Sequence, residues 1–183
     1  MTFDTTKDAY NKYTEYPNLS YNTISYLMDN NEMIWKLLYY NDSEAWSQAN
    51  LTYAQKSGLV YDGSPDETKF NVFMDTGQDY AWTRETTVLR IFPAELTPEN
   101  YVFGQVLMGF EVYSYYKLNH LSNYQIRIDL IVQQLIETLN GQDIGGLGRL
   151  YFDAKASPRN RVTTIGQLPW KGKGLLMSNH ITS

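Results

Sequence analysis

The spacing of the apolar residues changes along the chain, and this change limits the fold more than any other feature of the sequence. Between residues 20 and 40 the spacing is helical, in two stretches interrupted at Asn30 and Asn31. From residue 69 to residue 115 the spacing is two, which is typical of strands. Helical spacing returns at 123–140, and further strand-like segments follow. This order predicts an α+β fold with a mainly antiparallel sheet.

The clearest predicted element is a helix at 123–140, with Ser122 as its N-cap and Gly141 as its stop. Its apolar stripe consists of Ile128, Ile131, Val132, Leu135, Ile136 and Leu139. Arg127 falls among the polar residues that lie mostly off this stripe. A stripe of this kind predicts that the long amphipathic helix packs on the apolar face of the sheet.

Three strands are predicted before this helix, at residues 69–74, 86–92 and 101–115. Pro93 is expected to stop the second strand, because proline cannot donate to a ladder of hydrogen bonds. The third strand alternates, and its apolar even positions are Val102, Val106, Met108, Phe110 and Val112. Its odd positions include Gln105 and Glu111. One face of the sheet is therefore expected to be buried and the other partly wet.

The chain of 183 residues is of a length that suits one domain. Residues 1–19 are polar and rich in Tyr, which predicts a flexible N-terminal arm. Residues 20–183 form the predicted single α+β domain, with N-terminal helices and an extended basic loop at about 154–174. The first residues lack the basic and apolar regions of a signal peptide. No apolar run is long enough for a transmembrane helix, so no membrane partner is expected.

Charge is distributed unevenly along the chain. Residues 149–183 hold six basic residues and one acidic residue, a net charge of +5, whereas the preceding 148 residues hold nine basic and nineteen acidic residues, a net charge of −10. This division fits ordinary surface charge, head-to-tail self-association or a nucleic-acid patch. The last ranks lowest, because no recognition motif accompanies it. The candidate partner-contact residues are Arg149, Arg159, Arg161, Lys171 and Lys173.

Catalytic motifs are sparse. The chain has no Cys and only two His, far apart, so we expect no multi-His metal site, no zinc-finger or iron–sulfur site and no Cys nucleophile. The triplet Asp75-Thr76-Gly77 resembles the active-site loop of aspartic proteases, in which two such loops share one proton. Gln78 stands where that family carries a small residue. A turn is the favoured interpretation, and an aspartic-protease-like hydrolase using Asp75 is an alternative from another class.

Three blocks of sequence carry a family resemblance. They are residues 24–40, a broken helix pair, residues 89–112, two strands, and residues 124–150, which run from Tyr124-Gln125-Ile126 to Gly148-Arg149-Leu150. Together they resemble virion structural proteins from the neck of tailed bacteriophages, and the order of elements is similar to that of tail-terminator and other head–tail joining proteins.

This resemblance implies a homo-oligomeric ring, commonly sixfold, at the head–tail junction, with no catalysis and no cofactor. Its implied partners are further copies of the chain, neighbouring neck, tail-tube or sheath proteins, and non-specifically the packaged DNA. The implied location is the virion, after assembly in the host cytoplasm. The Tyr-rich arm is not needed in the simplest terminators, which leaves a head–tail adaptor or stopper ring as an alternative.

Overall fold

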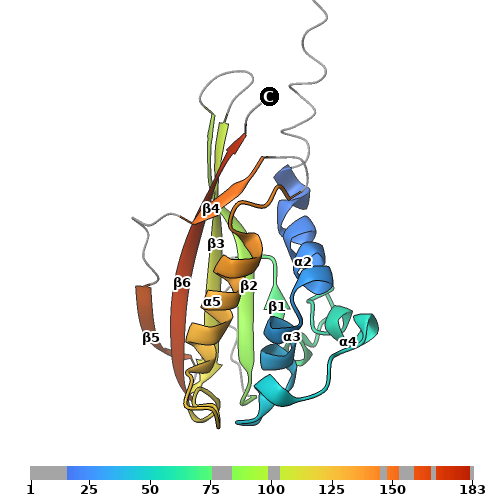
Figure 1. Ribbon diagram of the computed structural model, residues 1–183, viewed down its shortest axis with the longest axis vertical. Coiled ribbons are helices and arrows are strands. Elements are labelled where there is room, and N and C mark those ends of the chain that lie inside the picture. The colour runs from blue at the N-terminus through green and yellow to red at the C-terminus, as the bar shows by residue number, and fades with distance from the viewer. Residues whose placement is uncertain are drawn as a thin grey trace, which may run out of the picture.

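The computed structural model describes residues 16–75, 84–98, 104–144, 148–152, 159–165 and 168–181. These residues form one sheet with helices packed against one of its faces (Figure 1). The helices are α2 (Leu19–Asn30), α3 (Glu32–Tyr39), α4 (Tyr53–Ser57) and α5 (Arg127–Leu139), with short 3₁₀ turns η1 (Tyr16–Asn18), η2 (Ala45–Ser47), η3 (Glu67–Lys69) and η4 (Tyr116–Leu118). The strands are β1 (Val72–Phe73), β2 (Thr87–Pro98), β3 (Gly104–Tyr115), β4 (Leu150–Phe152), β5 (Arg159–Ile165) and β6 (Leu168–Ile181). The predicted α+β class is confirmed.

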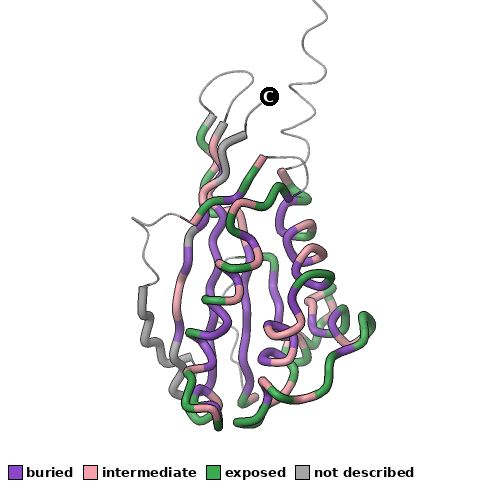
Figure 2. The backbone as a smooth tube through the Cα atoms, in the orientation of Figure 1, coloured by how far each residue is buried: buried purple, intermediate pink, exposed green. Residues whose placement is uncertain are grey.

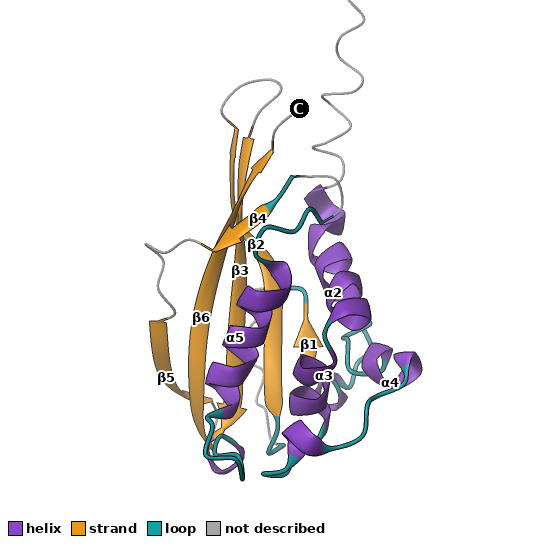
Figure 3. Ribbon diagram, viewed as in Figure 1, coloured by secondary structure: helices purple, strands orange, loops and turns teal. Residues whose placement is uncertain are grey.

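The sheet is mainly antiparallel. Its described strands lie in the order β1-β2-β3-β6-β4, and β5 pairs with another part of β6 (Figure 3). Only the short contact of β1 with β2 is parallel among these ladders. β2, β3 and β6 are the long central strands, and β1 and β5 flank them on opposite sides. The sheet therefore has two distinct edges.

The main core lies between the sheet and the helices. The even positions of β3 face this core, and Val106, Met108, Phe110 and Val112 are all fully buried. Leu175 and Met177 of β6, which pair with Phe110 and Met108, join the same cluster. The α5 residues Ile131, Leu135 and Leu139 are fully buried against it (Figure 2).

Helix α5 is shorter than the predicted 123–140 and begins at Arg127. Ser122 does not cap it: the Ser122 hydroxyl accepts a hydrogen bond from Trp46 Nε1 at 3.1 Å. Asn119 Oδ1 accepts from the Ile128 amide instead, at 3.2 Å. The chain before the helix turns through Tyr124, whose φ of 66° is left-handed. The helix starts later than predicted because Asn119, eight residues before Arg127, accepts hydrogen bonds from the first amides of the helix.

The N-terminal helices follow the predicted spacing. Ile24, Leu27 and Met28 of α2 are buried. Asn31 separates α2 from α3, because its Oδ1 accepts from the Ile34 amide at 2.9 Å and caps α3. Residues 1–15 of the predicted arm lie outside the described residues. Leu19, placed in that arm by the sequence, is fully buried in the first turn of α2.

Two strand predictions need correction. β1 spans only Val72–Phe73 rather than 69–74, and both its residues are buried rather than alternating. β2 does not stop at Pro93 but runs to Pro98. The register against β3 shifts between Pro93 and Glu95, and in the described residues β1 pairs with β2 only at Leu89 and Arg90. Proline is tolerated at such bulges and on open strand edges.

The predicted extended basic loop at 154–174 is corrected where the structure describes it, and its residues 154–158 and 166–167 lie outside the described residues. Residues 159–165 form β5 and residues 168–181 form β6, and the two strands pair from Arg159 with Gly174 to Ile165 with Leu168. The β-branched run Val162-Thr163-Thr164-Ile165 favours a strand over a loop. Pro169 is the second residue of β6, and proline is compatible with the start of a strand.

Candidate functional site

The basic edge of the sheet is the hairpin of β5 and β6. Residues 159–174 hold four basic residues and no acidic one. Arg159 and Arg161 pair with Gly174 and Gly172, whereas Lys171 and Lys173 pair with Val162 and Asn160. Directly paired residues share a face and neighbours in a strand alternate, so the two arginines lie on one face and the two lysines on the other.

The lysine face is the one that carries the helices. Lys173 of β6 pairs with Val112 of β3, and Lys173 Nζ lies 2.5 Å from Asp129 Oδ1 on α5. This ion pair is internal to the chain. Arg149 lies apart, in an isolated bridge with Asp143 that precedes β4. The five predicted contact residues therefore do not form one surface, and Arg159 and Arg161 are the pair that shares the face opposite the helices.

The acidic edge of the sheet lies on the other side, beyond β1. Residues 16–75, which build α2, α3, α4 and β1, hold eight acidic and three basic residues. Within them, the turn at 61–70 folds onto the face opposite the helices, where Tyr61 and Phe70 pack against a small cluster of Phe73, Val88, Tyr113 and Tyr115. The Tyr61 ring lies 5.4 Å from Phe70 and 5.5 Å from Phe73. The acidic turn and the two arginines thus occupy the same face at opposite edges.

Two carboxylates in this turn are held in the charged form. Asp62 Oδ1 accepts hydrogen bonds from the hydroxyl and the amide of Ser64, and these lower the pKa of Asp62. Asp66 accepts from the Thr68 hydroxyl at 2.6 Å and pairs with Lys69 at 3.0 Å, and these contacts lower the pKa of Asp66. Both side chains therefore carry their negative charge throughout the neutral range.

Lys56, one of the three basic residues of this half, is buried and neutralised internally. Lys56 Nζ lies 2.7 Å from Glu32 Oε2 and donates to the Met28 carbonyl at 2.7 Å. Desolvation, the largest single effect on the pKa of Glu32, raises it, but the hydrogen bonds from Lys56 and the Leu51 amide together with nearby positive charge lower it overall. This pair fastens α4 to α2 and α3 without adding positive charge to the surface.

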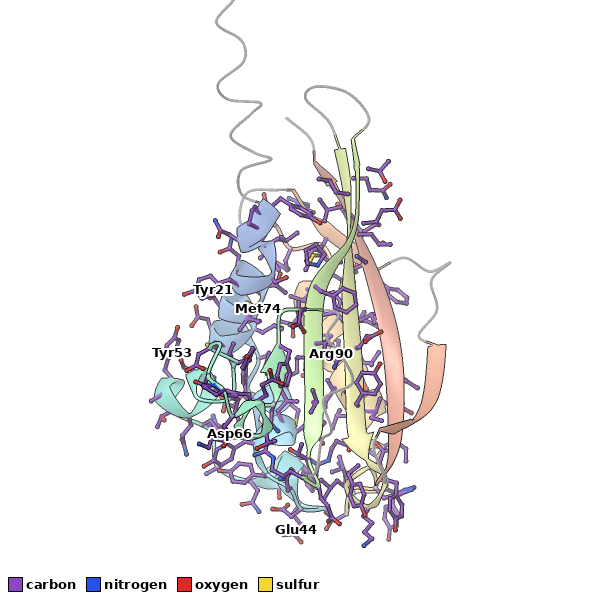
Figure 4. The ribbon with its side chains drawn as sticks, turned by 180° about the vertical axis from the view of Figure 1, so that it is seen from behind. Tyr21, Glu44, Tyr53, Asp66, Met74 and Arg90 are labelled. Atoms are coloured by element: carbon purple, nitrogen blue, oxygen red, sulfur yellow. The ribbon has the colours of Figure 1, made fainter. Side chains whose placement is uncertain are left out.

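A polar row also crosses the face opposite the helices, and sequence reasoning missed it. Arg90 of β2 pairs directly with Glu111 of β3, and both are buried. The Tyr113 hydroxyl donates to Glu111 Oε2 at 3.0 Å, and the Arg90 guanidinium lies 5.8 Å from the Tyr113 ring centroid. Figure 4 shows Arg90 on this side of the sheet. The sequence signal that could have revealed this row is the opposite charge of Arg90 and Glu111 in two neighbouring predicted strands.

Arg127 is a second missed feature, since the sequence placed it among the polar residues mostly off the stripe and the structure buries it fully. Its guanidinium donates to the carbonyls of Leu118, Leu37, Tyr40 and Asp42. Burial lowers the pKa of Arg127 to about 10. Its contacts are all backbone oxygens, so it joins the start of α5 to the end of α3 rather than presenting charge to a ligand.

Asp75 of the protease-like triplet lies at an exposed bend directly after β1, and Thr76 and Gly77 lie outside the described residues. Within the described ranges, no group of three or more His, Asp or Glu side chains is arranged to hold a metal ion. No helix in the part of the chain that the structure describes has the length and hydrophobicity needed to cross a bilayer.

The fold and its edges thus define an α+β protein whose sheet carries opposite charge on its two sides. The chain belongs to the YomW family, whose model matches residues 31–163. This family derives from a Bacillus phage, and the chain is accordingly a phage-associated protein. The match spans α3 to most of β5, and so it includes the acidic turn at 61–70, Arg159 and Arg161 but neither α2 nor β6. A search of curated proteins found no match.

Proposed function

We propose that the chain is a structural protein of the phage particle that assembles into a homo-oligomeric ring at the head–tail junction, as a tail terminator or neck ring, with no catalytic role. The observation that carries this proposal is the placement of the acidic turn and Arg159 and Arg161 on one face at opposite edges of one sheet. A surface whose two sides differ in charge favours contacts between unlike surfaces of successive copies.

Such contacts repeat, because each copy that binds a neighbour through its basic edge still offers its acidic edge. Repetition by a rotation that closes gives a ring, and a rotation that does not close gives a filament. A two-fold dimer sets like charges against each other when its axis passes through one edge, whereas an axis through the shared face sets each acidic turn against the arginines of the other copy. The charge pattern therefore favours contacts between unlike edges, and the ring with its sixfold count rests on the family resemblance.

The proposed partners beyond other copies are neck, tail-tube or sheath proteins, and the proposed location is the virion. The net charge of −5 suits a ring near packaged DNA, because a net acidic wall does not hold phosphates tightly. A head–tail adaptor or stopper ring is the alternative within the same class. A gold-labelled copy, located by electron microscopy of intact particles, distinguishes these positions.

The mass distribution of the purified protein, measured by mass photometry at 0.1 M and 1 M salt, tests the ring. We expect one defined oligomer that weakens as the Debye length falls from ~10 Å to ~3 Å. The double variant Arg159→Glu/Arg161→Glu should impair assembly while its thermal midpoint stays unchanged. Unaltered assembly with lost affinity for duplex DNA would instead identify the arginines as a nucleic-acid patch and contradict the proposal.

A further inference from the structure

Three large side chains protrude on the side of the molecule that carries the turn with Asp62 and Asp66. This side is called the acidic flank from here on. Tyr53 is 61% exposed, Tyr21 is 59% exposed and Met74 is 39% exposed. They come from α4, α2 and the bend after β1, and Figure 4 shows all three, with Asp66, on the same flank. Tyr is enriched at protein interfaces, where it anchors contacts, and Met adapts its shape to a partner.

The frame beneath these side chains is fixed. Thr52 and Gln55 form a capping box at the start of α4. The backbone N–H of Gln55 donates to Thr52 Oγ1, and the backbone N–H of Thr52 donates to Gln55 Oε1. Lys56, one turn further, is tied to Glu32 and to the Met28 carbonyl of α2. Val60, just after α4, bridges to Val72 of β1. A partner that binds here therefore orders side chains rather than backbone, which lowers the entropic cost of binding.

Resting on the proposed ring, we propose that this flank is the receptor for the β5–β6 hairpin of a second copy of the chain. Arg159 and Arg161 stand two residues apart on one face of β5, so their Cα atoms are separated by about 7 Å. The receptor offers them tyrosine rings for stacking and the carboxylates of Asp62 and Asp66 for charge-assisted hydrogen bonds. The apolar side chains form the centre of the contact and the carboxylates its rim.

Charge complementarity identifies the occupant. The hairpin at 159–174 holds four basic residues and no acidic one, whereas residues 16–75 hold eight acidic and three basic residues, a net charge of −5 that the internal pair of Glu32 and Lys56 leaves unchanged. The two surfaces lie at opposite edges of the sheet, too far around one molecule to meet each other. They meet only between copies.

The test combines an anchor deletion with a charge exchange, read by sedimentation velocity over a range of protein concentrations. Tyr53→Ala should raise the concentration needed for half-assembly at least tenfold. Tyr124→Ala is the matched control, because Tyr124 is 99% exposed but lies on the connection between β3 and α5, and it should leave assembly unchanged. All the substituted positions are exposed or on an edge strand, and circular dichroism checks that each variant folds.

The charge exchange uses Asp66→Arg and Arg161→Glu. Each substitution alone should weaken assembly at least tenfold, and the two together in one chain should recover most of the loss, because the exchanged charges again attract. Glu44→Arg, at an acidic residue away from the flank (Figure 4), is the matched control and should have little effect. Assembly that responds to Glu44 or Tyr124 as strongly as to Asp66 and Tyr53 overturns the receptor surface.

Two outcomes separate this inference from the proposed function. A salt-sensitive ring that forms equally well with Tyr53→Ala and Asp66→Arg keeps the ring and overturns the receptor. A chain that stays monomeric at every concentration overturns both.

Discussion

The two faces of the central sheet are buried by different chemistry. The face under α2, α3 and α5 is apolar, with Phe110, Val112 and their neighbours fully buried. The other face carries a smaller aromatic cluster around Tyr113, together with the buried pair of Arg90 and Glu111. The same alternating strand β3 supplies both surfaces. Alternation of residue type thus reports which face the helices cover, but it does not report that the other face is exposed.

The difference assigns separate tasks to the faces. Apolar burial under the helices supplies most of the folding free energy, because it scales with the apolar area removed from water. Arg90 and Glu111 pair only in one register, and a slip of one residue would send their side chains to opposite faces. We therefore expect substitutions under the helices to cost the most, those on the opposite face less, and those at exposed bends almost nothing.

The largest effect is expected at Arg127, where the helix layer is joined. Arg127→Met removes the donors of four backbone carbonyls in a fully buried site. Unsatisfied buried acceptors each cost about 1–3 kcal/mol, and with partial relaxation we expect a total loss of about 3–5 kcal/mol. Urea unfolding measures it. The free energy of unfolding of Arg127→Lys should lie between those of the wild type and Arg127→Met, because lysine keeps the charge but not the planar fork of donors.

Leu135→Ala tests the packing of α5 on the even face of β3. Leu135 is fully buried, so the substitution should destabilise the fold by about 2–5 kcal/mol. Gln133→Ala, at an exposed position of the same helix, should change the free energy of unfolding by less than about 0.5 kcal/mol. A thermal midpoint of Leu135→Ala within error of the wild type would show that α5 is not part of the core.

On the opposite face, Gly109 is expected to be sensitive for a steric reason. A Cβ at Gly109 would lie 2.5 Å from the ring of Phe92, its partner across β2 and β3. Gly109→Ala should therefore cost about 1–3 kcal/mol, as overpacking does. The same substitution in a Phe92→Ala background should cost clearly less, because the obstructing ring is gone. Equal costs in both backgrounds would rule out the ring as the cause.

Sequence spacing predicted the parts of the fold that depend on one-dimensional pattern. The class, the burial of Ile24 and Leu27, and the apolar even positions of β3 follow from periods of 3.6 and 2. The predictions were wrong for features that depend on residues distant in sequence. The start of α5 depends on Asn119, and the burial of Arg127 depends on carbonyls near residue 40. No local pattern contains these contacts.

The predictions for the candidate site succeeded and failed for the same reasons. The opposite charges of the two parts of the chain are visible in composition, and Arg159 and Arg161 were among the predicted residues. That Lys173 turns inward to Asp129 depends on the register of β6 with β3 and on the place of α5. The exposed tyrosines of the flank were not separable from core tyrosines, because Tyr is common throughout the chain.

Exposed Tyr124 should show a small effect with an informative sign. Its backbone is left-handed, which costs an ordinary residue about 1–2 kcal/mol and glycine almost nothing. Tyr124→Gly should therefore be more stable than Tyr124→Ala by about 0.5–1 kcal/mol, after part of the gain is lost to the greater freedom of glycine in the unfolded chain. Thermal unfolding of the two variants measures the difference, and a less stable glycine variant would contradict the left-handed assignment.

The smallest effect is expected for Asp75→Asn, which should leave both stability and peptide hydrolysis unchanged. Catalysis by an aspartic dyad needs two carboxylates that share one proton, so one chain with a single triplet needs a two-fold partner. Asp75 lies at an exposed bend on the acidic flank, and the proposed ring sets that flank against the basic hairpin of the next copy rather than against a second Asp75. A hydrolase therefore requires the arrangement that the charges of the two edges oppose. Hydrolysis assays at acid pH, with and without pepstatin, decide between them: inhibitor-sensitive cleavage by the wild type that Asp75→Asn abolishes would replace the ring with a two-fold enzyme.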